Sequence, residues 1–116
     1  YGDFLRSAAN ATREDDPNTD NVAFKFDDFE AFTKGYLKGG RSFLTDLEIE
    51  NLPYATALFP YMQTVRFFAD YLNGDTYFKV QYPEHNLDRA RNQLRLLQCV
   101  EEATPRLEAF IREQLG

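Results

Sequence analysis

Apolar residues recur at steps of three and four positions almost from end to end of this 116-residue chain. That spacing gathers them on one side of an α-helix, which has 3.6 residues per turn. No stretch alternates strongly enough to predict a strand, and no internal repeat is present. The sequence therefore predicts an all-α protein of five or six helices, with residues 1–116 forming a single compact unit. The longest predicted helix, roughly Pro53–Leu72, carries one apolar stripe made of Tyr54, Leu58, Tyr61, Val65, Phe68 and Leu72.

Polar residues at fixed spacing mark two helix starts. Asp27 is followed by Glu30, and Thr45 is followed by Glu48, three residues on in each case. This is the spacing of a capping box, in which the first side chain accepts from the helix backbone and the second returns the bond. The polar stretch Arg13–Asn21 contains a proline and is predicted to be a loop.

Glycine and proline mark the expected ends and interruptions of the helices. Gly39-Gly40 and Asn73-Gly74 should end helices, because glycine accepts the left-handed conformation. Pro60 lies inside the longest helical pattern and should bend that helix or split it. A helix from about Asn86 should stop before Thr104-Pro105, where proline is well placed in the first turn of a last helix.

Charge and composition exclude some functions. The formal net charge of −6 argues against a nucleic-acid partner, which would require a basic face. The longest apolar runs are shorter than the roughly 20 residues of a membrane span, and no signal-peptide pattern is visible. The single cysteine, Cys99, has no partner for a disulfide or a zinc site. We expect a core position for it, no membrane partner and a reducing, cytoplasmic setting.

The segment Arg66–Gln93 carries the most specific motif, RFFADYLNGDTYFKVQYPEHNLDRARNQ. It resembles the C-terminal end of the aminoglycoside-phosphotransferase-like kinases, in the branch that contains the N-acetylhexosamine 1-kinases. Those enzymes have a similar run: an Arg near the end of a long helix, Asp-Tyr-Leu, a Gly-Asp turn, Tyr-Phe-Lys and Pro-Glu-His-Asn-Leu-x-Arg-Ala-Arg. The resemblance covers nearly the whole chain, with a weaker match over the first fifty residues. It implies the helical C-terminal subdomain of a protein-kinase-like phosphotransferase fold.

The resemblance also implies an activity for the parent protein. The parent would transfer the γ-phosphate of ATP, with Mg²⁺, to a sugar, at the anomeric hydroxyl of an N-acetylhexosamine or a related acceptor. The catalytic loop and the nucleotide-binding lobe would lie upstream of residue 1, because the chain has no His-Gly-Asp-x-x-x-x-Asn-like loop and no glycine-rich phosphate motif. We therefore expect no catalytic or metal-binding residue in this fragment and no activity from it alone. Its expected partners are the sugar acceptor, the missing N-terminal lobe, and a second copy bound through the exposed lobe face.

Arg66 and Tyr77 are the candidate substrate-binding residues. In the hexosamine kinases the matching Arg, and the Tyr eleven residues later, contact the sugar. A guanidinium offers several donors in a fixed fork, and a tyrosine offers a ring face and a hydroxyl. A second interpretation needs no ligand: Arg66 and Asp70 are four residues apart, share a side with Gln63 opposite the apolar stripe, and could form an exposed intrahelical ion pair.

Several alternatives remain open. The related kinases read approximately Leu-Glu-Cys-Gly just before the Arg, where this chain has Met62 and no carboxylate, so the identity of the sugar is undetermined. The chain could also be a non-enzymatic helical interaction module, or part of a phosphotransferase with another small-molecule acceptor. Only the kinase interpretation requires Arg66 and Tyr77 to converge on one concave surface. His85, the only histidine, is expected to order its loop by a hydrogen bond, since no nucleophile is placed for it to activate.

Overall fold

The computed structural model describes all of residues 1–116 and contains five α-helices, one short 3₁₀ turn and no strand. The prediction of an all-α chain with five or six helices is confirmed. A single isolated β-bridge joins Asn10 and Phe24. The elements in chain order are α1 (Gly2–Ala8), η1 (Thr19–Asn21), α2 (Phe26–Gly40), α3 (Asp46–Glu50), α4 (Leu52–Leu72) and α5 (His85–Leu115).

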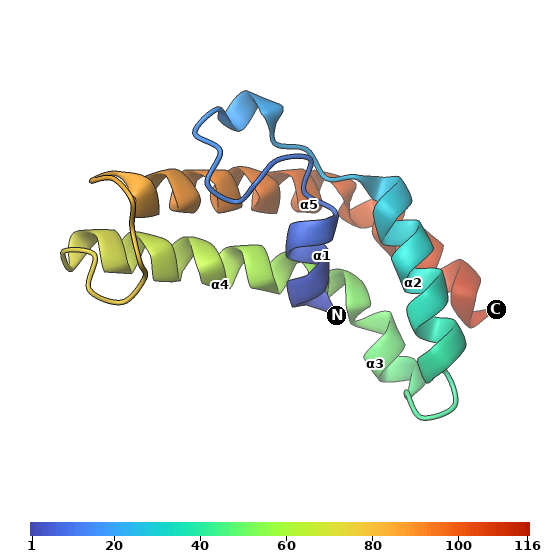
Figure 1. The fold of residues 1–116 in the computed structure, drawn as a ribbon. Coiled ribbons are helices and arrows are strands. Elements are labelled where there is room, and N and C mark those ends of the chain that lie inside the picture. The colour runs from blue at the N-terminus through green and yellow to red at the C-terminus, as the bar shows by residue number, and fades with distance from the viewer.

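Helices α4 and α5 run antiparallel, side by side, and form the body of the molecule (Figure 1). The side of α4 that is withdrawn from solvent carries residues at alternating steps of four and three, the spacing of a helix seam. Where the two helices meet near their connecting loop, the side-chain amide of Asn86 donates to Asp70 at 2.8 Å. One turn further along, the guanidinium of Arg89 lies 5.6 Å from the ring centre of Phe67. The seam on α4 consists of Thr56, Pro60, Gln63, Phe67 and Asp70.

The burial of the two sides of α4 is therefore the reverse of what the residue pattern suggests. The apolar stripe that begins at Tyr54 and ends at Leu72 is largely exposed. Asp70, which sequence reasoning placed with an exposed polar group, is buried against α5. That expectation was wrong because the loop after α4 supplies hydrogen-bond donors for the carboxylate, and a buried polar group is tolerated when it is bonded.

Neither interior proline divides a helix. The prediction that Thr104-Pro105 begins a separate helix is wrong, since α5 continues for 31 residues through Pro105. Helix α4 likewise continues through Pro60 for 21 residues. A proline removes only one backbone bond, and packing on both sides can hold the helix together. Figure 1 shows the last turns of α5 departing from the line of its first half, as expected for a proline kink.

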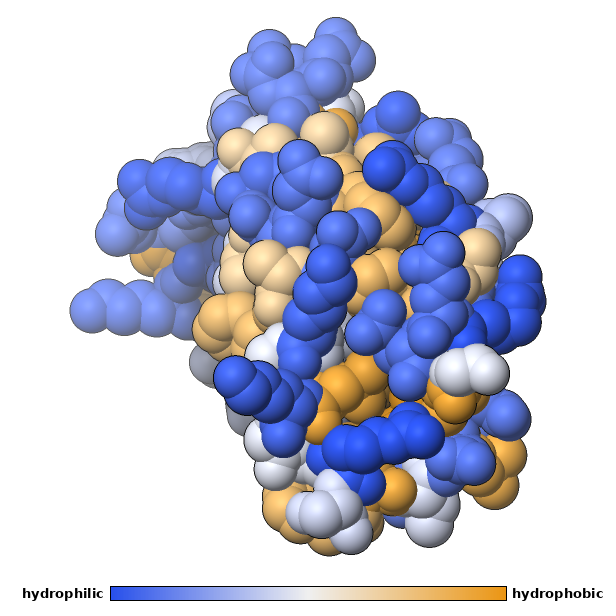
Figure 2. Space-filling model, turned by 90° about the vertical axis from the view of Figure 1, so that its right-hand side faces the viewer, coloured by the Kyte–Doolittle hydropathy of each residue, from blue (hydrophilic) through white to orange (hydrophobic).

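The hydrophobic core lies where α1, α2 and α3 meet the C-terminal half of α5. Aromatic rings contribute much of it: Phe29 packs 5.8 Å from Phe110 and 5.6 Å from Phe26, measured between ring centres. Figure 2 views the molecule from the side on which the C-terminus lies in Figure 1; blue polar side chains project from most of this face, with orange apolar side chains between them. The fully assembled core cluster consists of Leu5, Ala9, Phe29, Leu37, Ile49, Leu52, Val100, Leu107, Phe110 and Ile111.

One of the two predicted capping boxes forms. The hydroxyl of Thr45 accepts from the backbone N–H of Glu48 at 3.1 Å, and the Glu48 carboxylate accepts from the N–H of Thr45 at 3.2 Å. The other prediction is wrong, because α2 begins at Phe26 with Lys25 at the cap position, two residues before the predicted cap Asp27, and has no side-chain cap. That start places Asp27 inside the first turn, where its charge favours the positive end of the helix dipole without capping it.

The predicted helix ends at glycine are confirmed in position. Helix α2 ends at Gly40, although without a left-handed residue, and α4 ends just before Asn73-Gly74 with Gly74 at φ 88°. No helix is long and apolar enough to cross a membrane.

Candidate functional site

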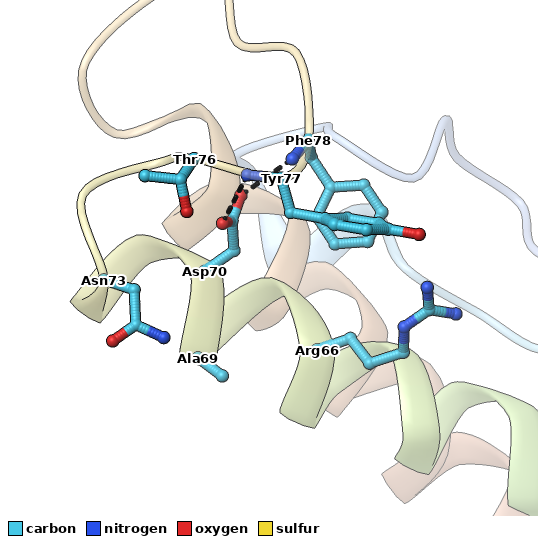
Figure 3. Close-up of a pocket in the computed structure, with 7 residues that line it drawn as sticks. All are labelled: Arg66, Ala69, Asp70, Asn73, Thr76, Tyr77 and Phe78. Carbon is cyan, nitrogen blue, oxygen red and sulfur yellow. Dashed lines mark hydrogen bonds between the residues drawn. The ribbon is translucent and has the colours of Figure 1, made fainter.

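The carboxylate of Asp70 folds the loop that follows α4. One oxygen accepts from the backbone N–H of Tyr77 at 2.8 Å, and the other accepts from the N–H of Phe78 at 2.9 Å (Figure 3). The side-chain amide of Asn86 at the start of α5 donates to the same carboxylate at 2.8 Å. One acidic side chain therefore connects the end of α4, the loop and the beginning of α5.

The environment of Asp70 favours its charged form. Burial is the largest single influence and acts to raise its pKa. The backbone donors of Phe78 and Tyr77 act in the opposite direction, with further donors from Thr76 and Asn86. Together the donors outweigh burial and hold the pKa of Asp70 below its ordinary value of 3.8.

A tight left-handed turn brings the loop back over the helix. Gly74 has φ 88° and Asp75 has φ 60°, a conformation that glycine adopts freely and aspartate tolerates. The backbone N–H of Asp75 donates to the carbonyl of Asp70 at 2.8 Å, and its side chain accepts from Asn86 at 3.0 Å. The Gly74-Asp75 pair is thus a structural turn, as predicted.

The structure brings Arg66 and Tyr77 to one concave surface, a hollow of about 380 Å³ beside α4. The Cζ atom of Arg66 lies 5.8 Å from the ring centre of Tyr77 and 5.5 Å from that of Phe78. The two rings meet edge to face, with centres 4.9 Å apart. The lining consists of Arg66, Ala69, Asp70, Asn73, Thr76, Tyr77 and Phe78.

The guanidinium of Arg66 has aromatic neighbours but no polar partner within the protein. The second interpretation, an exposed ion pair between Arg66 and Asp70, is wrong, since Asp70 turns toward the loop backbone. The guanidinium of Arg66 makes neither an ion pair nor a hydrogen bond within the protein and rests instead beneath the aromatic rings. Figure 3 shows this guanidinium and the hydroxyl of Tyr77 extending toward the same side of the hollow. The hollow therefore offers unused donors next to a ring face, an arrangement suited to oxygen-rich ligands.

His85 ties two loops together at the same end of the molecule. Its Nδ1 accepts from the backbone N–H of Gln81 at 3.1 Å, which leaves the proton on Nε2 to be donated to Asp15 at 2.9 Å. This bond from His85 is the main reason that the pKa of Asp15 is lowered. The expectation that His85 orders its loop is confirmed, while the long-range bond to Asp15 was not foreseen.

Tyr82 completes the packing around His85. Its ring stacks on the imidazole with centres 4.6 Å apart, and its hydroxyl donates to Asp88 at 2.7 Å. Burial, followed by the bond to Asp88, raises the pKa of Tyr82 to about 12. The ring and the hydroxyl are thus both occupied in holding the loop, which leaves His85 enclosed rather than open to a ligand.

The sequence reasoning did not assign five of the seven lining residues to the site: Ala69, Asp70, Asn73, Thr76 and Phe78. Asn73 and Thr76 flank the Gly-Asp turn, so their place in the hollow depends on the path of the turn rather than on a residue pattern. No three or more His, Cys, Asp or Glu side chains gather as a group able to hold a metal ion. A comparison of the chain with models of known protein families finds no match.

Proposed function

We propose that this chain is the helical, acceptor-binding C-terminal subdomain of an ATP-dependent sugar kinase of the aminoglycoside-phosphotransferase-like superfamily. The parent would phosphorylate an N-acetylhexosamine or a related sugar at its anomeric hydroxyl. The observation that carries the proposal is the convergence of Arg66 and Tyr77, 5.8 Å apart, on one hollow. These are the two residues that the resemblance assigns to the sugar.

In this proposal the two residues position the acceptor. The guanidinium of Arg66 donates to hydroxyl or acetamide oxygens, and the exposed ring of Tyr77 packs against the C–H face of the sugar. Holding the acceptor in one orientation lowers the entropic part of the barrier to phosphate transfer. ATP and Mg²⁺ would be held by segments upstream of residue 1, and no residue of this chain is assigned to either.

The electrostatics of the hollow support an uncharged or anionic acceptor over a cationic one. Arg66 contributes a positive charge without a counter-ion in the protein. Asp70 also lines the hollow, but its carboxylate already accepts from the N–H groups of Tyr77 and Phe78. A cationic acceptor would need a carboxylate free to accept its protons.

The test uses the parent protein with ATP, Mg²⁺ and a panel of hexoses, N-acetylhexosamines and aminoglycosides. We expect turnover with an N-acetylhexosamine, and a roughly 10- to 100-fold rise in the acceptor KM for Arg66→Ala with the KM for ATP nearly unchanged. Arg91→Ala, which removes an exposed arginine from α5, is the matched control. An equal loss of acceptor and ATP binding in Arg66→Ala would make Arg66 structural. A folded parent that is silent across the panel would favour a different acceptor or a non-enzymatic helical module.

A further inference from the structure

Helix α4 presents an apolar stripe to solvent in which five of the six residues are exposed and only Leu58 is half-buried. Tyr54 is 65% exposed, Tyr61 56%, Val65 50% and Leu72 67%. The C-terminal part of this face, at Val65, Phe68 and Leu72, also forms one wall of an apolar groove of about 530 Å³ whose other wall is α5. Single exposed apolar residues are ordinary, whereas a continuous row of this length marks an interaction surface.

The spacing of this face indicates that its partner is another helix. The stripe of six residues from Tyr54 to Leu72 follows alternating steps of four and three, which is the spacing of a coiled-coil seam. Over the 21 residues of α4 the only charged side chains are Arg66 and Asp70, and neither belongs to the stripe. A neutral seam does not repel an identical seam.

The face is also complementary to itself. When two copies of α4 lie antiparallel about a two-fold axis at the level of Gln63, each stripe residue of one copy faces a stripe residue of the other. Every layer then joins one aromatic residue to one aliphatic residue, which lets large and small side chains interdigitate. The layers pair Tyr54 with Leu72, Leu58 with Phe68 and Tyr61 with Val65.

The area is sufficient for a dimer. A fully covered aromatic side chain buries about 150–250 Å², so the exposed parts of the face amount to roughly 600 Å² per chain. Two faces then cover roughly 1,200 Å², the lower end of the range for specific interfaces.

From these features we propose that the chain forms an isologous dimer through the apolar face of α4, with the two α4 helices antiparallel. The occupant of the face is thus a second copy of this chain. The proposal does not depend on the sugar-kinase assignment.

Sedimentation velocity on the 116-residue chain tests the proposal. Interfaces of about 1,200 Å² lie at the weak end of the specific range, so the measurement is made at about 100 µM, where we expect a species of twice the 13.5 kDa chain mass. Val65→Glu places a carboxylate in the central layer and should raise the dissociation constant at least about tenfold. Leu47→Glu, which changes a 68% exposed leucine on α3, is the matched control and should leave the dimer intact.

A charge-pair variant tests the register. Tyr61→Lys alone should also weaken the dimer, but combined with Val65→Glu it sets lysine opposite glutamate across the axis, and the dimer should return at low salt. Circular dichroism of each variant checks that the fold is retained. A monomeric wild-type chain, or a dimer that Val65→Glu leaves unchanged, overturns the proposal and assigns the face to another segment or partner. Failure of the double variant to recover overturns the antiparallel register.

Discussion

Three hydrogen-bond donors converge on the carboxylate of Asp70, two from the loop backbone and one from Asn86. At the scale of the single residue, this carboxylate determines where Tyr77 lies. Its oxygens accept from the loop and from Asn86, and Asp70 makes no ion pair with Arg66. The carboxylate of Asp70 thus fixes the backbone of Tyr77 and does not occupy the guanidinium of Arg66.

Replacing Asp70 by Asn should loosen the loop and change the response to acid. Because the pKa of Asp70 is lowered from 3.8 by folding, its ionised form stabilises the fold fully above about pH 4, and this contribution is lost as the pH falls below that value. We expect Asp70→Asn to lower the thermal midpoint near neutral pH and to lose less stability than wild type on acidification. Faster hydrogen exchange at the N–H groups of Tyr77 and Phe78 should accompany the change.

The control for this prediction is Glu108→Gln, which neutralises an exposed carboxylate on α5. Parallel pH profiles for wild type and Asp70→Asn would show that Asp70 is not the source of the acid sensitivity. Unchanged exchange at Tyr77 and Phe78 would show that the loop holds without the carboxylate.

At the scale of the element, the sequence predicted helices well and helix faces less well. The step of three and four located α4 close to its observed bounds, and Thr45 with Glu48 located the start of α3 through its capping box. The same local rules failed at Pro105, because packing of the C-terminal turns against the core holds α5 together across the missing bond. They failed again at Asp70, because the donors that permit its burial come from a loop whose path the pattern cannot show.

The candidate site was predictable only in part. The resemblance supplied Arg66 and Tyr77 as residues, but their proximity depends on the left-handed turn at Gly74 and Asp75. The exposure of the apolar stripe was not predictable either, because helical periodicity identifies a face without saying what covers it.

The contact between α1 and α4 should be sensitive to one methyl group. A Cβ atom at Gly2 would overlap the backbone carbonyl oxygen of Ala55 and lie 2.7 Å from the ring of Phe59. A clash with backbone cannot be relieved by a rotamer change, so Gly2→Ala should destabilise the fold by about 1–3 kcal/mol. Urea denaturation monitored by circular dichroism measures the effect.

The same substitution at Gly35 provides the comparison. A Cβ there meets nothing within 4 Å, and the residue lies inside α2. Gly35→Ala should therefore stabilise the chain by about 0.5–1 kcal/mol through helix propensity. Equal effects at the two glycines would contradict the close approach of α1 to α4.

At the scale of the whole molecule, polar side chains on α5 hold a distant loop in place. The amide of the fully buried Asn92 donates to the hydroxyl of Thr12 at 3.0 Å and to the carbonyls of Arg13 and Asp16 at 3.0 and 3.3 Å. Its oxygen accepts from Asn10 at 3.0 Å. The predicted loop is therefore an ordered layer on α5, although it has almost no regular structure of its own.

Removing this connection should affect the loop and the global stability together. Asn92→Ala leaves several buried groups without partners, and we expect a loss of about 1–3 kcal/mol in the free energy of unfolding. Limited proteolysis should then cut first within residues 10–21. Gln98→Ala, at an exposed position of the same helix, is the control and should change neither quantity. An intact loop in Asn92→Ala would mean that His85 and Asp15 suffice to hold it.

Ala69 belongs to the lining of both hollows beside α4, the one that contains Arg66 and the apolar groove against α5. Ala69 is thus a small side chain at the border between a polar hollow and an apolar groove. A larger side chain at position 69 would reduce the volume of both hollows, whereas alanine leaves both open. A ligand in the first hollow and a second chain against the apolar groove would therefore both contact Ala69.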